Sequence, residues 1–235
     1  MKKELIKKYQ NASKEALKRL IADAKTTPEF LTVSRSNKKL VPNEREAFII
    51  WNLQAKTTCP YATEHCKALC YAIKAETAYP DCLPSRVRHF MDTRKPEFVI
   101  NMAYTILKIA SGCRKQEIIV RIHESGDFYN KVYVAMWLQI MAICAIDKRI
   151  KFIAYTKSFP FFDGVELPRN FAFRASVWDD TKQEFLEMIA RNGWAIYTAV
   201  DKFAKGDTFT RCRCSDCATC GKCWKKYRDI RCEIH

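Results

Sequence analysis

The sequence predicts an α/β protein, a partial (β/α) barrel of about five to six parallel strands, with an N-terminal helix and a cysteine-rich C-terminal metal-binding tail. Short apolar runs of strand length alternate with longer helical stretches, and such alternation implies parallel pairing through right-handed crossovers. Unusual polar residues follow the predicted strands, at the positions where β/α barrels gather their chemistry. An open doubly wound sheet is the alternative fold.

The composition divides the chain into three parts. Residues 1–45 form the N-terminal helix and a connector, residues 46–205 the partial barrel with its cysteine loop, and residues 206–235 a cysteine-rich basic tail. Apolar residues recur at helical spacing over residues 5–25, with lysines mostly on the other face. This segment is therefore predicted to be an outer helix.

The predicted strands of the barrel are, in order, Phe48–Leu53, Ile118–Ile122, Phe152–Tyr155, Phe171–Ala175 and Trp194–Thr198. The predicted helices between them are Pro84–Met91, Pro96 to about Ala110, Tyr129–Ile146 and Thr181–Arg191. Pro96 suits the first turn of its helix, because a proline there removes no helical hydrogen bond.

The charge predicts a polyanionic partner. The chain has 41 basic and 26 acidic side chains, a net charge of +15. Residues 1–39 contribute +7 and residues 202–235 contribute +5, so the excess gathers at the two ends. A basic surface of this kind favours nucleic acid or a nucleotide as partner, although a soluble protein can simply be basic.

The chain has twelve cysteines, and the cellular compartment decides whether they are expected to form disulfides. No apolar run approaches the roughly 20 residues of a membrane helix, and no apolar segment follows the basic N-terminus. The sequence therefore predicts a cytoplasmic protein with no membrane partner. In that compartment the cysteines are better interpreted as metal ligands or reduced thiols than as disulfides.

Cys59, Cys66 and Cys70 lie directly after the first predicted strand. Soft thiolates bind iron–sulfur clusters and zinc tightly. Three thiolates would leave one iron of a [4Fe–4S] cluster open to water, substrate or a cofactor, which favours a catalytic cluster. The alternative is a set of reduced structural cysteines or an incomplete zinc site.

A second cysteine set has the pattern Cys212-x-Cys214-x2-Cys217-x2-Cys220-x2-Cys223. Five cysteines in twelve residues, surrounded by basic residues, do not form a hydrophobic core. The spacing suits zinc and a second iron–sulfur cluster equally, and the set could instead complete the first site. The predicted ligands are Cys214, Cys217, Cys220 and Cys223.

Polar residues at the later strand ends complete the candidate site. The predicted catalytic residues are His123, Asp127 and Lys157, and the predicted cofactor-binding residues are Ser125, Gly126, Arg174 and Ser176. A histidine beside a glutamate can move protons near neutral pH, although Ser125-Gly126-Asp127 can also be a turn into a helix. Arg174 alternates with apolar residues, so it should point into a polar interior.

Three motifs resemble the phage "gene product 88" family of phages and mobile elements. They are Thr58-Cys59-Pro60 with Cys66 and Cys70-Tyr71-Ala72, then Arg121 to Phe128, and Cys220-Gly221-Lys222-Cys223-Trp224, so the resemblance covers roughly residues 34–224. The cysteine loop is also similar to that of radical S-adenosylmethionine enzymes, with a wider spacing. That resemblance implies S-adenosylmethionine as cofactor, an electron donor as partner, and Ser125-Gly126-Asp127 near the methionyl amino group.

A second resemblance points to different chemistry. Cys212-x-Cys214-x2-Cys217 is similar to the start of the zinc motif of tRNA-guanine transglycosylases, which would make Asp127 a nucleophile. The sequence thus predicts an iron–sulfur protein of phage or mobile-element origin, a radical S-adenosylmethionine-like enzyme acting on nucleic acid or a nucleotide. The alternatives are a zinc-containing base-exchange enzyme on DNA or RNA, and a non-enzymatic, metal-stabilised nucleic-acid-binding protein.

Overall fold

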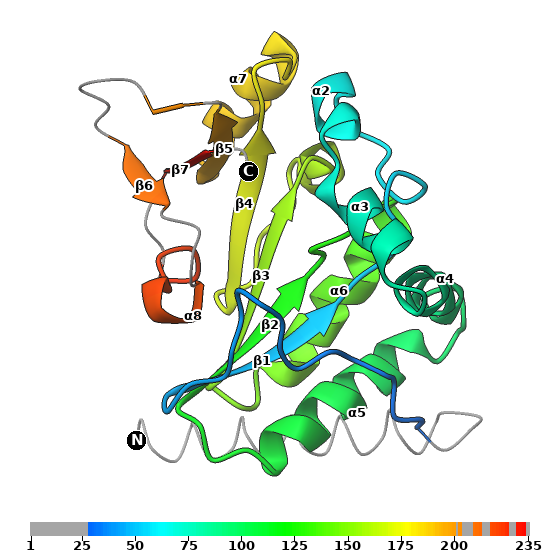
Figure 1. Ribbon diagram of the computed structural model, residues 1–235. Helices are drawn as coiled ribbons and strands as arrows, with labels where there is room; N and C mark the ends of the chain where they lie inside the picture. The colour runs from blue at the N-terminus through cyan, green and yellow to red at the C-terminus, as the bar shows by residue number, and fades with distance from the viewer. Residues whose placement is uncertain (1–27, 201, 204–208, 213–216, 226–228, 234–235) are drawn as a thin grey trace, which may run out of the picture.

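The structure is a computed structural model that describes residues 28–200, 202–203, 209–212, 217–225 and 229–233. Its centre is one parallel sheet of seven strands in the order β1-β2-β3-β4-β5-β7-β6. The sheet curls into a half-barrel with a convex and a concave face (Figure 1). The helix predicted over residues 5–25 lies outside the described residues.

The seven strands are β1 Glu46–Trp51, β2 Glu117–Ile122, β3 Ile150–Thr156, β4 Phe171–Val177, β5 Ile196–Val200, β6 Thr210–Cys212 and β7 Ile230–Glu233. The first five confirm the predicted strands to within a few residues. The prediction of five to six strands was too low, because β6 and β7 come from the cysteine-rich segment. Both are short and lack the apolar run that marks the other strands.

The helices are α2 Glu64–Ala68, α3 Tyr71–Ala78, α4 Cys82–Asp92, α5 Phe98–Ser111, α6 Lys131–Cys144, α7 Gln183–Arg191 and α8 Cys217–Cys220, with a 3-10 helix η1 at Phe159–Phe162. The four predicted helices of the barrel correspond to α4, α5, α6 and α7. The helices α2 and α3 were not predicted, since they lie inside the cysteine loop and have no clear apolar face.

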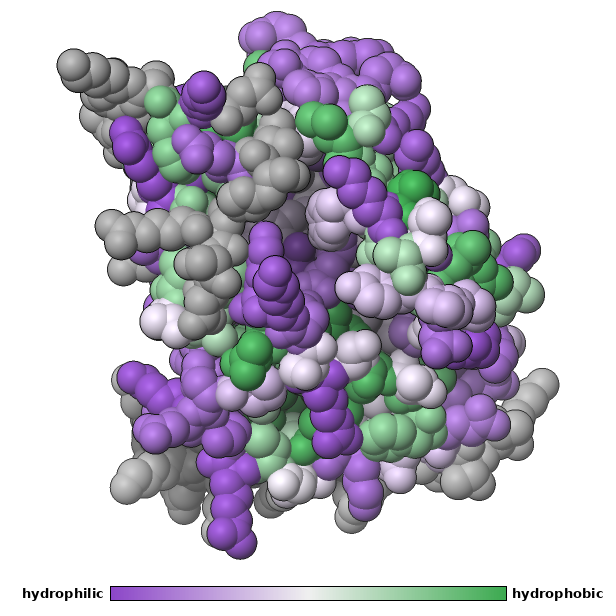
Figure 2. Space-filling view, viewed as in Figure 1, coloured by the Kyte–Doolittle hydropathy of each residue, from purple (hydrophilic) through white to green (hydrophobic). Residues whose placement is uncertain are grey.

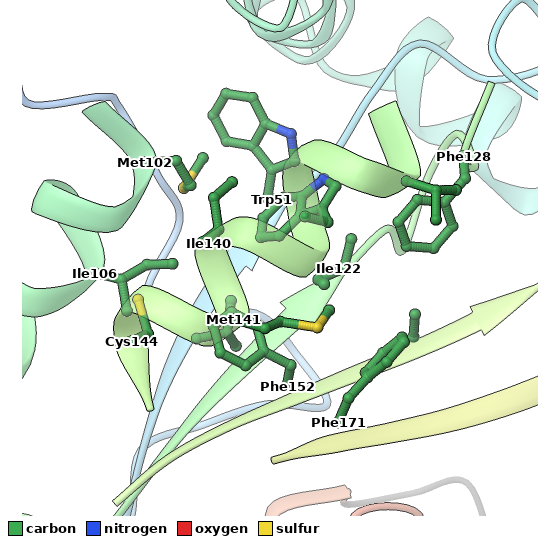
Figure 3. Packing of buried hydrophobic residues seen from close by; sticks show 14 of the residues in the cluster. Trp51, Met102, Ile106, Ile122, Phe128, Ile140, Met141, Cys144, Phe152 and Phe171 are labelled. Atoms are coloured by element: carbon green, nitrogen blue, oxygen red, sulfur yellow. The ribbon is translucent and has the colours of Figure 1, made fainter. Parts of the chain in front are cut away.

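The main core lies between the convex face of the sheet and the helices α5 and α6 (Figure 3). Alternate residues of each strand point to this side, as the pleat of a β-strand requires. Trp51, Ile122 and Phe152 come from the sheet, and Ile106 and Ile140 from the two helices; none is more than 1% exposed. This layer holds the strands rigidly beneath the loops that follow them.

The opposite, concave face is divided into two regions. Near the beginnings of the strands it is apolar and packs against residues of the C-terminal segment, forming a second core cluster that includes Phe48, Ile50, Ile119, Ile153, Ala218, Trp224 and Ile230. Trp224 Nε1 donates a hydrogen bond to Glu46 Oε1 (3.2 Å), and Cys217 N donates to Lys39 O (3.0 Å). The C-terminal segment is therefore part of the core and not a separate appendage.

In the described part of the chain, no helix has the length and apolar character needed to cross a membrane.

Candidate functional site

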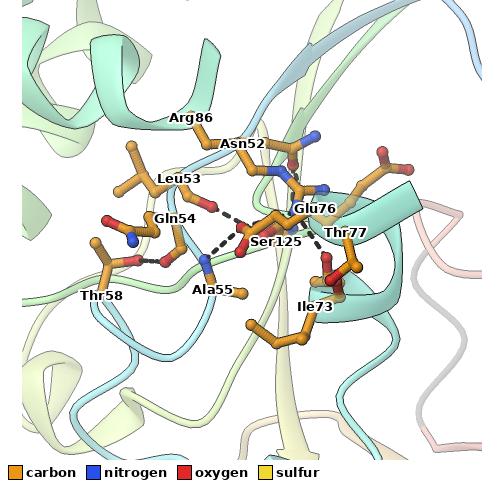
Figure 4. A network of polar contacts seen from close by, with 12 residues as sticks. Asn52, Leu53, Gln54, Ala55, Thr58, Ile73, Glu76, Thr77, Arg86 and Ser125 are labelled. Atoms are coloured by element: carbon orange, nitrogen blue, oxygen red, sulfur yellow. Dashed lines mark hydrogen bonds and ion pairs between the residues drawn. The ribbon is translucent and has the colours of Figure 1, made fainter. Parts of the chain in front are cut away.

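The loop after β1 is tied to the loop after β2 at the carboxyl ends of the strands, which we call the rim (Figure 4). Asn52 Oδ1 accepts hydrogen bonds from the backbone N–H groups of Glu124 (2.7 Å) and Ser125 (3.1 Å). Leu53 N donates to Ser125 O, and Ser125 Oγ donates to Leu53 O, both at 2.9 Å. These four bonds place the start of the cysteine loop against the turn that follows β2.

Gly126 makes this close approach possible. Its φ is +76°, and a Cβ at this position would lie 2.5 Å from Thr58 Oγ1 and 2.6 Å from Leu53 Cβ. Thr58 is itself buried and donates from Oγ1 to Gln54 O at 2.7 Å. The predicted cofactor-binding residues Ser125 and Gly126 thus hold the two loops together in this structure.

A buried ion pair between α3 and α4 also supports the cysteine loop (Figure 4). Glu76 Oε1 in α3 accepts from Arg86 Nη1 in α4 and from the backbone N–H of Ala55, each at 2.9 Å. Arg86 Nη1 also donates to Ala72 O at 3.0 Å. Both charged side chains are less than 10% exposed, so the pair is a rigid anchor for the loop.

The three cysteines of the loop stand on different local elements and face a common region. Cys59 lies before α2, Cys66 lies within α2, and Cys70 is the N-cap of α3. Thr63 caps α2 by accepting a hydrogen bond from Cys66 N at 3.2 Å. All three thiols are partly buried.

Electrostatic interactions show that these thiols are neighbours. Burial raises the pKa of the Cys59 thiol to about 12, with further contributions from the charge of Asp127 and from Cys66 and Cys70. Burial also raises the pKa of Cys66; Cys70 and Asp127 act in the same direction and Lys157 opposes them. The structure therefore brings the predicted cluster ligands together beside two of the predicted catalytic residues.

The thiols do not form a ready site for a single ion. Among the residues that the structure describes, no three histidine, cysteine, aspartate or glutamate side chains are placed so that they could hold a metal ion. A cluster is less demanding, because each thiolate binds a separate iron and the thiolates need not meet at one point. Three neighbouring thiols beside a lysine thus fit an iron–sulfur cluster in their donor chemistry.

Lys157 follows β3 and is 8% exposed. Its ammonium group donates to Ser176 Oγ at 2.9 Å and lies 5.0 Å from the centre of the Trp178 ring. Its charge also acts on the Cys66 thiol. Burial lowers the pKa of Lys157, while the charges of Cys66 and Asp127 raise it. The lysine is thus a buried cation next to a candidate ligand.

Asp127 connects the ends of β2 and β3. Its Oδ1 accepts from Thr156 Oγ1 (2.5 Å) and from its neighbour Phe128 N (2.8 Å). Its Oδ2 accepts from the backbone N–H groups of Lys157 (2.9 Å) and Ser158 (3.2 Å). Burial raises the pKa of this carboxyl group, and these hydrogen bonds oppose the rise. Because both oxygens are occupied, the contacts of Asp127 are those of a positioning residue for Lys157.

The His123 ring lies on the convex side of the sheet. Its φ is +61°, which turns the ring toward the convex-face core. There Nε2 lies 3.0 Å from Tyr133 Oη, and the ring meets Phe128 edge to face. Burial and, to a smaller extent, the charge of Arg121 lower the pKa of His123 to about 3, so the ring is neutral near pH 7. The contacts of His123 are those of a core residue.

Arg174 points into the interior, as its alternation with apolar residues predicts, and is 1% exposed. Its Nε and Nη2 donate to Cys223 O at 3.1 and 2.8 Å. In the described residues the guanidinium thus holds the C-terminal segment, while Ser176 on the same strand reaches Lys157. Of the predicted C-terminal ligands, Cys214 lies outside the described residues.

Sequence reasoning missed a basic and aromatic region on the concave face. The Arg121 guanidinium lies 4.0 Å from the centre of the Tyr155 ring, and Tyr155 meets Tyr197 edge to face at 4.7 Å. Arg121 Nη1 is buried without a hydrogen-bond partner. In the sequence, alternation within β2 gave the only signal, since Arg121 interrupts an apolar run. Figure 2 shows a hollow on this side of the molecule with hydrophilic residues at its floor.

A further contact joins the cysteine loop to the loop after β4. His65 Nδ1 lies 2.7 Å from Asp179 Oδ1, and His65 N donates to Asp180 Oδ2 at 2.9 Å. The His65 ring also meets Trp178 edge to face. The helix α2 therefore crosses part of the rim and places Cys66 near Lys157. No local pattern in the sequence predicts this contact.

A hollow of about 680 Å³ lies away from the rim, beside α6 and the beginnings of β3 and β4. Lys148, Lys151 and Arg169 are among its lining residues, and none of the predicted site residues lines it. Because β/α barrels carry their chemistry at the carboxyl ends of the strands, we place the candidate site at the rim.

Comparison with known proteins identifies the family. Residues 29–226 match the family described as "Gene product 88". Two similar curated proteins are the "Gene 88 protein" of Mycobacterium phage L5, 30% identical over 105 residues, and that of Mycobacterium phage D29, 29% identical over 105 residues. Each alignment covers 43% of this chain and 43% or 42% of the relative, so the chain spans less than half the length of the curated relatives it matches. No solved structure shows a significant match. Since the family match extends over most of the chain, including the rim and the second cysteine set, the protein belongs to the phage gene product 88 family.

Proposed function

We propose that this protein is an iron–sulfur enzyme of the radical S-adenosylmethionine-like type that acts on nucleic acid or a nucleotide. Cys59, Cys66 and Cys70 would hold a [4Fe–4S] cluster at the rim. The observation that carries the proposal is the gathering of these thiols beside Lys157 and Asp127, at the carboxyl ends of parallel strands. A bound cluster with three protein thiolates supplies single electrons and leaves one iron open to an exchangeable ligand.

Among the described residues, Lys157 acts on this site through its charge. Its ammonium group, held by Ser176 and by the face of Trp178, places a positive charge against the Cys66 sulfur. That charge favours the thiolate form, which is the form that binds metal. Asp127 fixes the backbone of Lys157 and so keeps the cation in place.

The concave face next to the rim is suited to a nucleotide or a nucleic-acid segment. Tyr155 and Tyr197 offer aromatic surfaces, and aromatic side chains stack with bases of any sequence. Arg121 adds a half-buried cation beside these rings, and its charge would favour a phosphate or a carboxylate bound on this face. The net charge of +15 supports an anionic partner of this kind.

The base-exchange alternative has less support from the geometry. It requires a free aspartate as nucleophile, and Asp127 is buried and accepts four hydrogen bonds. An attack from this carboxylate would break the contacts that hold the loop after β3. We therefore propose the iron–sulfur function as primary.

Anaerobic purification followed by iron and sulfide analysis tests the cluster. We expect brown protein with about four irons per chain and absorbance near ~400 nm. Cys66→Ala should lose the iron. Cys113→Ala, at the start of the connection from α5 to β2, should retain it. Iron content unchanged in Cys66→Ala, or colourless wild-type protein, would contradict the proposed site.

A second assay tests the radical chemistry on cluster-loaded protein. Dithionite and S-adenosylmethionine are added, and the products are separated. Methionine and 5′-deoxyadenosine in equal amounts are expected from the wild type and not from Cys66→Ala. A loaded cluster that yields neither product would retain the iron–sulfur site and remove the radical reaction.

A further inference from the structure

Four cysteines of the C-terminal segment surround one small cavity. Cys212 ends β6, Cys217 and Cys220 begin and end α8, and Cys223 follows in the next turn. Together with Gly221, Lys222 and Trp224 they line a space of about 10 Å³. Two separate elements, β6 and α8, thus contribute cysteines to the lining of one cavity.

The thiols are near enough to affect one another. Burial raises the pKa of Cys217 to about 11, and the charges of Cys223 and Cys212 add to the rise. Cys212 also acts on Cys223 in the same direction. The turn between Cys220 and Cys223 is tight, because Gly221 has a φ of +58°. A residue with a left-handed backbone between two cysteines lets both sulfurs approach one centre.

The size of the cavity distinguishes between the possible metals. A volume of about 10 Å³ is about that of one water-sized sphere. A zinc ion with sulfur ligands at about 2.3 Å fits such a space. A cubane of four irons and four sulfides is many times larger than this space. In the present arrangement the sulfurs do not yet meet at coordination distance, so binding requires the side chains to turn toward the cavity.

The elements around the cavity are too short to be stable alone. The helix α8 has four residues and β6 has three. Isolated helices of this length are unstable in water, and small segments of this kind are held by metals or disulfides. Cys232 in β7, the strand that pairs with β6, is disulfide-bonded, contrary to the expectation of reduced or metal-bound thiols. A crosslink among the four other cysteines would in addition fix β6 and α8.

The same segment covers the concave face near the beginnings of the strands. Cys223 O accepts two hydrogen bonds from Arg174, and the Cys223 thiol interacts electrostatically with Tyr155. Trp224 packs on Phe48 with ring centres 5.9 Å apart. Cys223 and its neighbour therefore connect the cysteine cavity to β1, β3 and β4.

We propose that Cys212, Cys217, Cys220 and Cys223 bind one zinc ion, and that this ion holds the C-terminal segment as a plug in the concave face. The ligand set differs from the one predicted from the sequence, since it includes Cys212 in place of Cys214. The zinc site is independent of the proposed cluster at the rim. Its function is structural, because four protein thiolates leave zinc no open position.

Metal analysis of the full chain tests the assignment. Zinc and iron are measured in protein purified without chelator, for the wild type and for Cys217→Ser, Cys214→Ser, Cys113→Ser and Cys66→Ala. We expect one zinc per chain in the wild type, its loss in Cys217→Ser, and its retention in the other three. Cys66→Ala should lose iron alone, so failure of the cluster and failure of the zinc site are distinguishable.

A second measurement uses only wild-type protein, so it tests the proposal even if Cys217→Ser does not fold. Wild-type protein is treated with a zinc chelator and then with protease. Chelation should release one zinc and make the region around α8 several-fold more sensitive to cleavage, and added zinc should reverse the change. Wild-type protein without zinc, zinc retained in Cys217→Ser or lost in Cys214→Ser, or unchanged protease sensitivity after zinc removal would overturn the proposal.

Discussion

Two residues at the rim, Gly126 and His123, show how a positive φ decides what a residue can contact. Gly126 and His123 both adopt positive φ in the turn after β2, with opposite consequences. Gly126 lets the cysteine loop approach, whereas the same region of φ turns the His123 ring away from the rim. A positive φ thus permits a loop contact at Gly126 and turns a side chain into the core at His123.

Gly126→Ala should destabilise the protein more than Gly164→Ala. Both glycines have positive φ, +76° and +72°, but a Cβ at Gly164 would have no neighbour within 4 Å. Strain alone costs about 1–2 kcal/mol, which is the expectation for Gly164→Ala. The collision with Thr58 and Leu53 should make the loss of unfolding free energy clearly larger for Gly126→Ala. Urea unfolding measures both, and equal losses would contradict the proposed close approach.

His123 should make the protein less stable in mild acid. Its pKa is about 3 in the folded chain and about 6.5 when unfolded, so the unfolded chain binds the extra proton between these values. The free energy of unfolding should therefore fall by up to about 1.4 kcal/mol per pH unit as the pH decreases below 6.5. His123→Asn, which tolerates positive φ, should reduce this slope. His89, whose pKa is also lowered by burial, is unchanged in both proteins. Identical slopes for the two proteins would show that His123 is not buried.

Whole elements cooperate to hold the cysteine loop, which is long and mostly polar. The helices α3 and α4 support it through Glu76 and Arg86, and α2 reaches the loop after β4 through His65. Neither α2 nor α3 buries enough apolar surface to be fixed by packing alone, since together they bury one residue, Ala72. Polar contacts therefore determine the position of the three thiols.

Glu76→Ala should loosen this loop and destabilise the fold. The change leaves Arg86 buried without its carboxylate, and breaking a buried pair in this way costs about 3–5 kcal/mol. Glu64→Ala, which removes an exposed pair with Lys67, should have little effect. Thermal unfolding gives the stability, and alkylation of Cys59 under native conditions gives the loop mobility. Slow alkylation in Glu76→Ala would show that the loop is held by other contacts.

At the scale of the whole molecule, the concave face has two regions. The region near the beginnings of the strands is apolar and is covered by the C-terminal segment, and the region nearer the rim is basic and aromatic. In the described part of the chain, the convex face packs against residues of α5, α6, η1 and α7. If the proposed function is right, an anionic ligand binds between Arg121 and the rim.

Binding of a single-stranded oligonucleotide should weaken steeply with salt, because phosphate contacts release counterions. If Arg121 contacts one phosphate, Arg121→Gln should reduce the slope of log K against log salt by about 0.7. Lys108→Gln, an exposed residue of α5 on the convex side, should leave the slope unchanged. Fluorescence anisotropy over a salt series measures all three proteins. Equal slopes for the wild type and Arg121→Gln would exclude Arg121 from the interface.

The predictions from sequence succeeded where the signal is local. Five strands and the four barrel helices were predicted because their apolar periodicity is strong. The rule for parallel strands led us to expect Cys59, Cys66, Asp127 and Lys157 at one rim, and their functional roles there stay predictions. The contacts of His123 were not predictable, because local composition does not reveal its positive φ. The contacts of Arg174 were not predictable either, because its acceptor, Cys223 O, lies 49 residues further along the chain.

The sequence by itself determined the alternation of strands and helices, the positions of the polar residues after the strands, and the two sets of cysteines. Only the tertiary structure decided that the C-terminal segment joins the sheet and fills its concave face. The physical reason is the distance along the chain: Trp224 meets Glu46 across 178 residues. Such a contact depends on the shape of the completed half-barrel, while a strand or helix depends on its own neighbouring residues.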